Sequence, residues 1–389
     1  MKFSKLTDRI ADLGSDKWAL HVEARKLKEN DEDVIELTIG EPDQLPAKIL
    51  IEKCYQSMLS GRTKYSNGRG EKNLLDALVD KYTRRSTVNI SNNNFLCLPG
   101  TQTALFATMM TLVDENDEVL VGDPYYATYE GIIRSSGANI KPIPLHHEYG
   151  FSIQESDIRE GITDNSKVLL LNSPHNPTGG VLTREEIQKL TDVCEEHDLW
   201  LVSDEVYEDL IFEKPFTSPI EIPELANRCI VVSSISKSHA APGFRSGWVL
   251  APNDVIEKML PLAETMLFGN QPFIADMTEF AVRNPSKTAI KMKTDYERRA
   301  KLICRELANV TYLDPLMPKA GMFILIKIKP AYSNADDFAW SLFREKRVAT
   351  MPGSSFGENG KNYIRLSLTV PDKLLLEACC RIKAFVREN

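Results

Sequence analysis

The chain has 389 residues, of which 42% are hydrophobic and 26% charged, a composition typical of a globular protein whose length favours two domains. Its net charge of −8, without a long basic block, argues against binding to a nucleic-acid backbone. No apolar run reaches the length of a membrane helix, and the first residues lack the apolar centre of a signal peptide. The seven cysteines show no disulfide or metal-binding spacing, so we expect a soluble, cytoplasmic protein without a structural metal site.

Strand and helix signals alternate along the chain. Apolar runs predict strands at 34–39, 95–98, 118–121, 167–171, 199–202, 229–233, 248–250, 323–328 and 363–368. Helical patterns lie between most of them, which predicts an α/β fold with a mainly parallel sheet flanked by helices. A capping box at 183–186 and Pro371-Asp372 mark helix starts, and a long charged helix is expected over 287–307. We expect residues 1–45 to form an N-terminal arm and part of a small domain, 46–284 a large domain, and 285–389 a smaller C-terminal domain.

One candidate reactive lysine follows a predicted strand. Lys237 ends the string SSISK, residues 233–237, and Arg245 follows eight residues later. An amine just past a buried strand can be desolvated, which favours the neutral form that attacks a carbonyl. Nearby serine hydroxyls and an arginine fork suit a phosphate group. Taken alone, this string is also typical of a solvated loop.

Two other polar segments follow predicted strands. The strand at 167–171 leads into NSPHNPTGG, residues 172–180, a turn that would leave the side-chain amide of Asn176 free to donate a hydrogen bond. The strand at 199–202 leads into SDEVY, residues 203–207, and places Asp204 at the carboxyl end of a strand. Open α/β sheets bind their ligands at that edge. A plain turn and a helix cap are the alternative explanations of these two segments.

In this order, the three segments resemble the class I aminotransferases of fold type I, which depend on pyridoxal 5′-phosphate. The resemblance extends over nearly the whole chain, from GEPD at 40–43 to YIRLS at 363–367. It implies a large cofactor-binding domain with a seven-stranded, mainly parallel sheet, a smaller α+β domain, and transfer of an amino group from an L-amino acid to a 2-oxo acid. The Trp18 region and segments 123–130, 236–240 and 266–269 look most like arginine–pyruvate aminotransferases, which implies a basic or polar donor and pyruvate as acceptor.

The resemblance also assigns catalytic roles. It makes Lys237 the lysine that carries the cofactor and moves a proton at the substrate Cα. Asp204 would keep the pyridine nitrogen protonated, so that the ring accepts electrons. Asn176 and Tyr207 would donate hydrogen bonds to the ring oxygen, and Tyr126 would stack on the ring.

A phosphate site is expected at the start of the helix over 103–112. The residues Gly100, Thr101 and Gln102 connect this helix to the strand at 95–98, and backbone amides at a helix N-terminus bind anions. The resemblance adds Ser234, Ser236 and Arg245 as ligands, and Tyr65 from the other subunit of a homodimer.

Arg365 matches the family's arginine that pairs with the substrate α-carboxylate, with help from a Gly40 amide and Asn176. The distal group of a basic donor would meet Trp18 and one of the acids at 41 and 43. Pro242, Phe244 and the segment DQLP at 43–46 depart from the commoner family pattern, which bears on the choice of substrate and not on the reaction.

Two alternatives share features with this chain. A nicotinamide-dependent dehydrogenase is disfavoured, because Asn73 stands where a third glycine would follow Gly68 and Gly70, and no clear strand precedes them. A carbon–sulfur β-lyase of the same fold, which expels a β-substituent, is not separated from an aminotransferase by the sequence.

Overall fold

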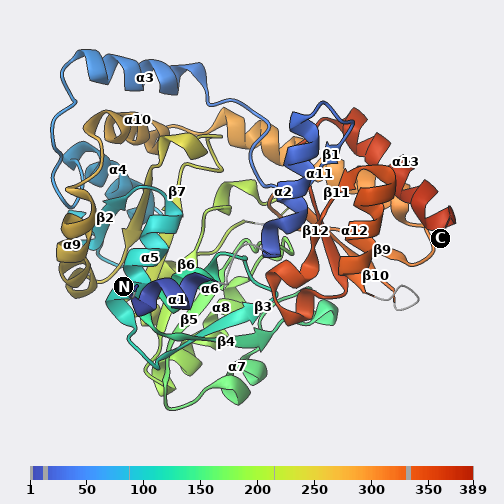
Figure 1. Ribbon diagram of the computed structural model, residues 1–389. Helices are drawn as coiled ribbons and strands as arrows, with labels where there is room; N and C mark the ends of the chain where they lie inside the picture. The colour runs from blue at the N-terminus through green and yellow to red at the C-terminus, as the bar shows by residue number, and fades with distance from the viewer. Residues whose placement is uncertain (1–2, 12–15, 87, 214, 330–333, 389) are drawn as a thin grey trace.

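A seven-stranded sheet lies at the centre of the larger part of the structure, a computed structural model that describes residues 3–11, 16–86, 88–213, 215–329 and 334–388 (Figure 1). The spatial order is β2–β8–β7–β6–β5–β3–β4. β8 runs antiparallel to both neighbours, and the other pairs are parallel. The strands are β2 (Phe95–Leu98), β3 (Glu118–Asp123), β4 (Asn139–Pro144), β5 (Ser166–Asn172), β6 (Trp200–Asp204), β7 (Cys229–Ser234) and β8 (Gly247–Leu250). The mainly parallel seven-stranded sheet is therefore confirmed.

Both faces of this sheet are buried, because its central strands are apolar on both sides. Leu201 of β6 and Val231 of β7 belong to one hydrophobic cluster, whereas the next residues, Val202 and Val232, belong to another. Such alternation is the period-two pattern of a strand covered on both faces. One face is covered by α5 (Thr101–Leu112), α6 (Tyr129–Ser136) and α9 (Asn253–Leu267), and the other by α4 (Lys72–Thr83), α7 (Glu155–Gly161), α8 (Arg184–Glu196) and α10 (Pro272–Arg283). α3 (Lys48–Leu59) packs on α10.

The second sheet is smaller and antiparallel, in the order β12–β13–β10–β9. Its strands are β9 (Leu313–Leu316), β10 (Phe323–Ile328), β12 (Met351–Pro352) and β13 (Tyr363–Ser367). Helices α11 (Lys287–Leu307), α12 (Ala335–Lys346) and α13 (Asp372–Glu388) surround it (Figure 1). The long helix expected over 287–307 is confirmed to the residue, and the predicted capping box holds the start of α8.

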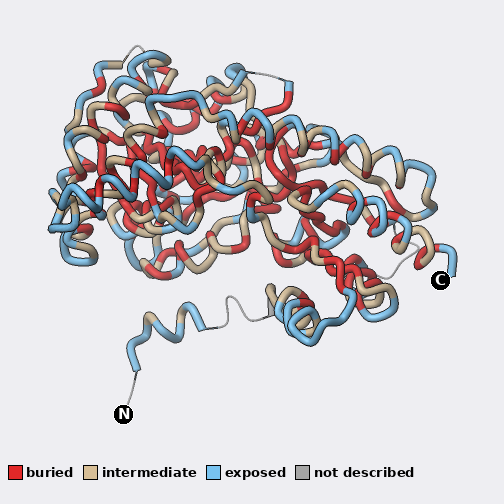
Figure 2. Tube along the Cα trace, turned by 90° about the horizontal axis from the view of Figure 1, so that it is seen from above, coloured by how far each residue is buried: buried red, intermediate tan, exposed pale blue. Residues whose placement is uncertain are grey.

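The N-terminal segment contributes to both parts. β1 (Ile35–Glu36) pairs in parallel with β11 (Val348–Ala349), and α2 (Ala19–Glu29) packs beside them. The strand expected over 34–39 is therefore only two residues long, because its ladder ends with its short partner. α1 (Lys5–Ala11) approaches α6 and buries none of its residues, as its exposed and intermediate colours in Figure 2 show. Within the described residues, no helix is both long and apolar enough to cross a membrane.

Candidate active site

A cavity of about 340 Å³ lies at the carboxyl ends of the parallel strands, between the two sheets. That volume falls within the range of small-molecule sites. Polar residues at or just after the ends of β5, β6 and β7 form its floor. The opposite side is closed by the segment that follows β1 and by residues of β10 and β13. The cavity is lined by Trp18, Ile39, Gly40, Glu41, Thr101, Gln102, Leu105, Tyr126, Asn172, Asn176, Asp204, Val206, Tyr207, Ser236, Lys237, Pro242, Arg245, Phe323 and Arg365. It thus brings together most of the residues predicted for the site.

Lys237 lies in the turn after β7, and its Nζ donates a hydrogen bond to the carbonyl of Gly40 at 2.7 Å. Burial lowers the pKa of this amine from 10.5 to about 8. The carboxylate of Glu41 raises this pKa, and the guanidinium groups of Arg365 and Arg245 lower it further. A substantial neutral fraction at neutral pH is what a nucleophilic amine needs.

Asp204 ends β6 and is buried at the floor of the cavity. Burial raises the pKa of its carboxyl to about 6. Hydrogen bonds from the Tyr129 hydroxyl and the Val206 amide oppose this increase. The Tyr129 bond measures 2.7 Å. Asn172, at the end of β5, donates to the Asp204 carbonyl at 3.1 Å and accepts from the Asn176 amide at 2.8 Å, and so ties the neighbouring strand ends together.

Two residues of this network, Tyr129 and Asn172, were not predicted from the sequence. Asn172 carried a signal, because it is a polar residue directly after an apolar strand. Tyr129 carried none, since its partner lies 75 residues further along the chain.

The start of α5 forms a cradle at one end of the cavity. Gly100 precedes the helix with φ of 85°, and no side chain caps the first turn. A Cβ atom at Gly100 would lie 2.4 Å from a terminal nitrogen of Arg245. Thr101 donates to the hydroxyl of Ser234 at 3.0 Å, which in turn accepts from the Ser236 amide at 3.3 Å. Uncapped amides, hydroxyls and a guanidinium at one helix N-terminus are suited to a phosphate group.

Arg365 of β13 is buried, with 2% of its surface exposed. It donates to the side-chain oxygen of Asn176 at 2.9 Å and to the carbonyl of Thr38 at 2.6 Å. Its guanidinium carbon lies 3.8 Å from the ring centre of Phe323 and 4.5 Å from that of Phe356. Burial lowers the pKa of this group to about 10, and among the described residues no carboxylate pairs with it. The Nε atom of Arg365 is buried and has no hydrogen-bond partner among the residues that the structure describes.

Three aromatic residues predicted for the site line the cavity: Trp18, Tyr126 and Tyr207. Tyr126 packs edge-on against Tyr129, with ring centres 5.5 Å apart. Tyr65 is the exception, since it is 87% exposed outside the cavity and packs on Phe268 at the surface.

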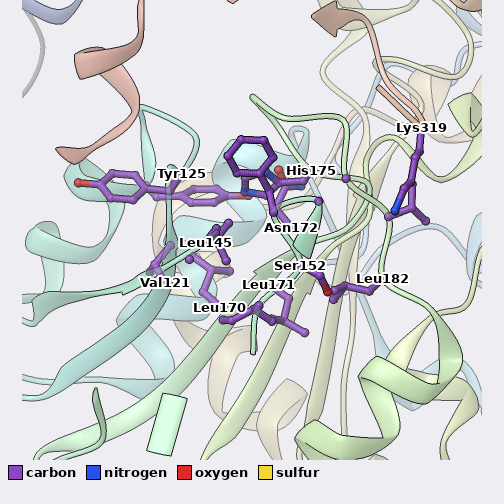
Figure 3. Close-up of a pocket in the computed structure, with 17 residues that line it drawn as sticks. Val121, Tyr125, Leu145, Ser152, Leu170, Leu171, Asn172, His175, Leu182 and Lys319 are labelled. Atoms are coloured by element: carbon purple, nitrogen blue, oxygen red, sulfur yellow. The ribbon is translucent and has the colours of Figure 1, made fainter. Parts of the chain in front are cut away.

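A second cavity adjoins the floor of the first. It measures about 30 Å³ and lies over Leu170 and Leu171 of β5, with Asn172 and His175 on one side (Figure 3). Burial lowers the pKa of His175 to about 4, so this ring is neutral at physiological pH. The volume is sufficient for water and far too small for a cofactor. This small cavity therefore lies behind the carboxyl end of β5 and is not a second cofactor site.

The residues present fit pyridoxal phosphate. The helix start and its hydroxyls provide an anion cradle, Lys237 provides an amine of lowered pKa, and Asp204 provides a buried carboxylate. These groups around one cavity, at the carboxyl edge of a mainly parallel sheet, define a pyridoxal phosphate enzyme of fold type I.

Comparison with known proteins identifies the family of the chain. It belongs to the aminotransferase class I and II family, whose model matches residues 32–382. It is 37% identical to the arginine–pyruvate transaminase AruH of Pseudomonas aeruginosa over 98% of this chain and 97% of that one. It is 31% identical to an aspartate aminotransferase of Bacillus subtilis, over 99% of this chain and all of the relative. A solved double mutant of Thermus thermophilus aspartate aminotransferase superimposes with a TM-score of 0.93, at 28% identity, and covers all of this chain and 99% of its own.

The chain is thus a pyridoxal phosphate-dependent aminotransferase, as the sequence predicted. The dehydrogenase alternative also fails structurally, because Gly68 and Gly70 lie in the loop between α3 and α4 and follow no strand. The β-lyase alternative gains no support, since these relatives are transaminases.

Proposed function

We propose that Lys237, Asp204 and Arg365 divide the chemistry of amino-group transfer in the large cavity. The observation that carries this proposal is the pairing of two unusual groups on one cavity: a buried guanidinium without a carboxylate partner among the described residues, and an amine whose pKa is about 8. A substrate α-carboxylate would neutralise the first group and leave its α-carbon near the second.

Pyridoxal phosphate supplies an aldehyde that binds amines and a ring that accepts an electron pair. With the cofactor bound, the Nζ of Lys237 would hold its aldehyde until an incoming amino group displaces it, and the freed amine would then be the base that takes the proton from the substrate Cα. Asp204 holds a proton at the ring nitrogen, because a buried carboxylate favours a cation as its neighbour. The Asn176 side-chain oxygen already accepts from Arg365, so its amide nitrogen is the donor left for the ring oxygen, together with the Tyr207 hydroxyl.

The remaining cofactor ligands act by position. Gly100, Thr101, Gln102, Ser234, Ser236 and Arg245 hold the phosphate, and Tyr126 covers the ring. Arg365 binds the α-carboxylate with both terminal nitrogens, and Phe323 and Phe356 keep its plane fixed. Reduction of the loaded protein with borohydride, followed by peptide mapping, tests the central assignment: the pyridoxyl group is expected on Lys237, and its recovery on another lysine would overturn it.

For the amino donor, we infer a basic amino acid, with pyruvate as the acceptor. The similarity to AruH supports this inference. Glu41 lines the cavity and forms no salt bridge within the described residues, and Trp18 lines it as well. Asp43 is not available, because it pairs with Arg299 at 2.8 Å and accepts from the Tyr296 hydroxyl at 3.1 Å. Glu41 is therefore the acid that would receive a distal guanidinium or ammonium.

A donor comparison tests this choice. With pyruvate and with 2-oxoglutarate as acceptors, kcat/KM for arginine and lysine is expected to exceed that for alanine, aspartate and phenylalanine. Glu41→Gln should reduce the arginine-to-alanine ratio about tenfold, the size of one charge-assisted contact. A tenfold preference for aspartate or phenylalanine over arginine would reject the basic donor and leave the aminotransferase assignment intact.

We also propose a homodimer with shared sites, working in the cytoplasm. Helix α3 exposes the apolar residues Ile49, Ile51, Tyr55, Met58 and Leu59, and Leu45, Tyr65 and Phe268 are exposed as well. Exposed apolar patches of this kind mark protein interfaces. All seven cysteines are free thiols, which suits a reducing compartment. Sedimentation velocity and cell fractionation test the two proposals, and a monomer or a periplasmic protein would refute them.

A further inference from the structure

Tyr129 makes a buried contact with the acid of the site without reaching the cavity itself. It is the first residue of α6, and 1% of its surface is exposed. Its hydroxyl lies 2.7 Å from Oδ2 of Asp204, whereas Oδ1 of the same carboxylate accepts from the Val206 amide at 3.3 Å. Asp204 lines the large cavity, and Tyr129 lines the small one behind it. Both oxygens of the carboxylate thus have fixed protein donors.

The hydroxyl of Tyr129 serves as a donor at every accessible pH. Burial and the neighbouring charge of Asp204 raise its pKa well above 10, so that the phenol stays protonated. A donated hydrogen bond favours the ionised form of a carboxylate. This contact therefore opposes the burial that raises the pKa of Asp204.

The ring of Tyr129 has little freedom to turn. Tyr126 packs against it edge-on with an angle of 89° between the rings, and the small cavity on its far side leaves room only for water. Asn172 fixes the backbone of Asp204 through its carbonyl. Asp204 is consequently held at its backbone by a side chain from β5 and at its carboxylate by a side chain from α6.

We propose that Tyr129 is a positioning residue that keeps Asp204 ionised and turned toward the ring nitrogen of the cofactor. The inference rests on the proposed role of Asp204 and adds the residue through which that role is maintained. Tyr129 would touch neither cofactor nor substrate.

The test compares two ligands that differ in one atom. Apoprotein is titrated, by its fluorescence, with pyridoxal 5′-phosphate and with the 1-deaza analogue, in which a C–H group replaces the ring nitrogen. Tyr129→Phe keeps the ring and removes the donor. It is expected to weaken binding of pyridoxal phosphate about tenfold, the effect of losing a hydrogen bond to a charged group, and to leave the analogue within about twofold.

Tyr82→Phe is the matched control. Tyr82 is also fully buried, and its hydroxyl accepts a hydrogen bond from Trp248 at 2.9 Å, away from the cavity. Its substitution should leave the ratio of the two affinities unchanged. Equal loss of both ligands in Tyr129→Phe, or no loss of pyridoxal phosphate, would overturn the inference, because a purely structural tyrosine does not distinguish nitrogen from carbon.

A double substitution separates this inference from the role of Asp204. In an Asp204→Asn protein, Tyr129→Phe should have no further effect on the affinity ratio, since the charge on which it acts is gone. If Asp204→Asn itself fails to distinguish the two ligands, the proposed role of Asp204 is wrong. Selective loss in Asp204→Asn without any in Tyr129→Phe would refute the role of Tyr129 alone.

Discussion

The side-chain amine of Lys237 donates a hydrogen bond of 2.7 Å to the carbonyl of Gly40, a residue 197 positions earlier in the chain. The contact joins the turn after β7 to the segment after β1 and holds the amine at the cavity. Burial nevertheless lowers the pKa of the amine to about 8, although a carbonyl acceptor favours the protonated form.

The rate at which the cofactor attaches to apoprotein should therefore depend on the lowered pKa of Lys237. The neutral amine is the reactive form, so the second-order rate of attachment, followed by stopped-flow absorbance, should rise with pH to a midpoint near 8 and then level off. Glu41→Gln should shift that midpoint downward, because the Glu41 carboxylate raises the pKa of Lys237. A rate that still climbs tenfold per pH unit up to pH 10 would contradict the desolvated amine.

Lys237→Ala should separate cofactor binding from turnover. The phosphate cradle remains, so pyridoxal phosphate should still bind, but transamination should fall by at least about a thousandfold because the proton-transfer group is lost. Equilibrium dialysis and a coupled transaminase assay measure the two quantities. Turnover within tenfold of the wild type would show that another residue moves the proton.

Gly100→Ala should damage the phosphate cradle specifically. The backbone there has φ of 85°, and a Cβ atom would overlap the guanidinium of Arg245. We expect the affinity for pyridoxal phosphate to fall at least about tenfold, whereas that for pyridoxal, which lacks the phosphate, should change little. Gly243→Ala is the control, since no atom lies within 4 Å of the added Cβ. Equal losses for both ligands would indicate a general folding defect.

Arg365→Lys should weaken substrate binding more than it slows the bound substrate. A lysine ammonium cannot donate from two directions to a carboxylate or stack between Phe323 and Phe356. The KM of the amino donor is expected to rise about tenfold or more, with a smaller fall in kcat. An unchanged KM would place the α-carboxylate elsewhere.

Shared sites predict complementation between two impaired subunits. After subunit exchange between Lys237→Ala and Tyr65→Phe proteins, each hybrid has one site that lacks both groups and one that is intact. About a quarter of all sites should then be fully active in an equal mixture, more than in the two proteins assayed apart. No gain after exchange, verified by mass spectrometry of the hybrids, would refute a role for Tyr65 across the interface.

The strands that the sequence predicted well are those with continuous apolar runs, including β2 at one edge of the sheet and β7 nearer its centre. The prediction at 95–98 is exact, and the one at 229–233 is one residue short, because continuous apolar runs are typical of strands buried on both faces. Strand β4 was missed, since it lies at the edge of the sheet and its sequence NIKPIP contains two prolines and a lysine. Such residues are common in edge strands and look like a loop in the sequence. The domain boundaries at 45 and 284 stay a prediction.

The candidate site divides in a similar way. Lys237, Asn176 and Asp204 stand directly after strands, and their sequence motifs predicted where they would meet. Tyr129 is different, because its contact with Asp204 depends on how α6 packs on the sheet, which a linear pattern does not encode. Asp43, one of the two acids predicted as alternatives for a distal charge, pairs with Arg299 far along the chain, a contact that a linear pattern does not encode either.

The parallel pairing of β1 with β11 sets the order in which the site can be completed during translation. Gly40 follows a strand whose partner is Val348–Ala349, and Arg365 is made later still. The ribosome must therefore reach Arg365 before the carbonyl that holds Lys237 and the guanidinium opposite it can both be in place. A site complete in these residues can therefore receive its vitamin-derived cofactor only after β13 has been made.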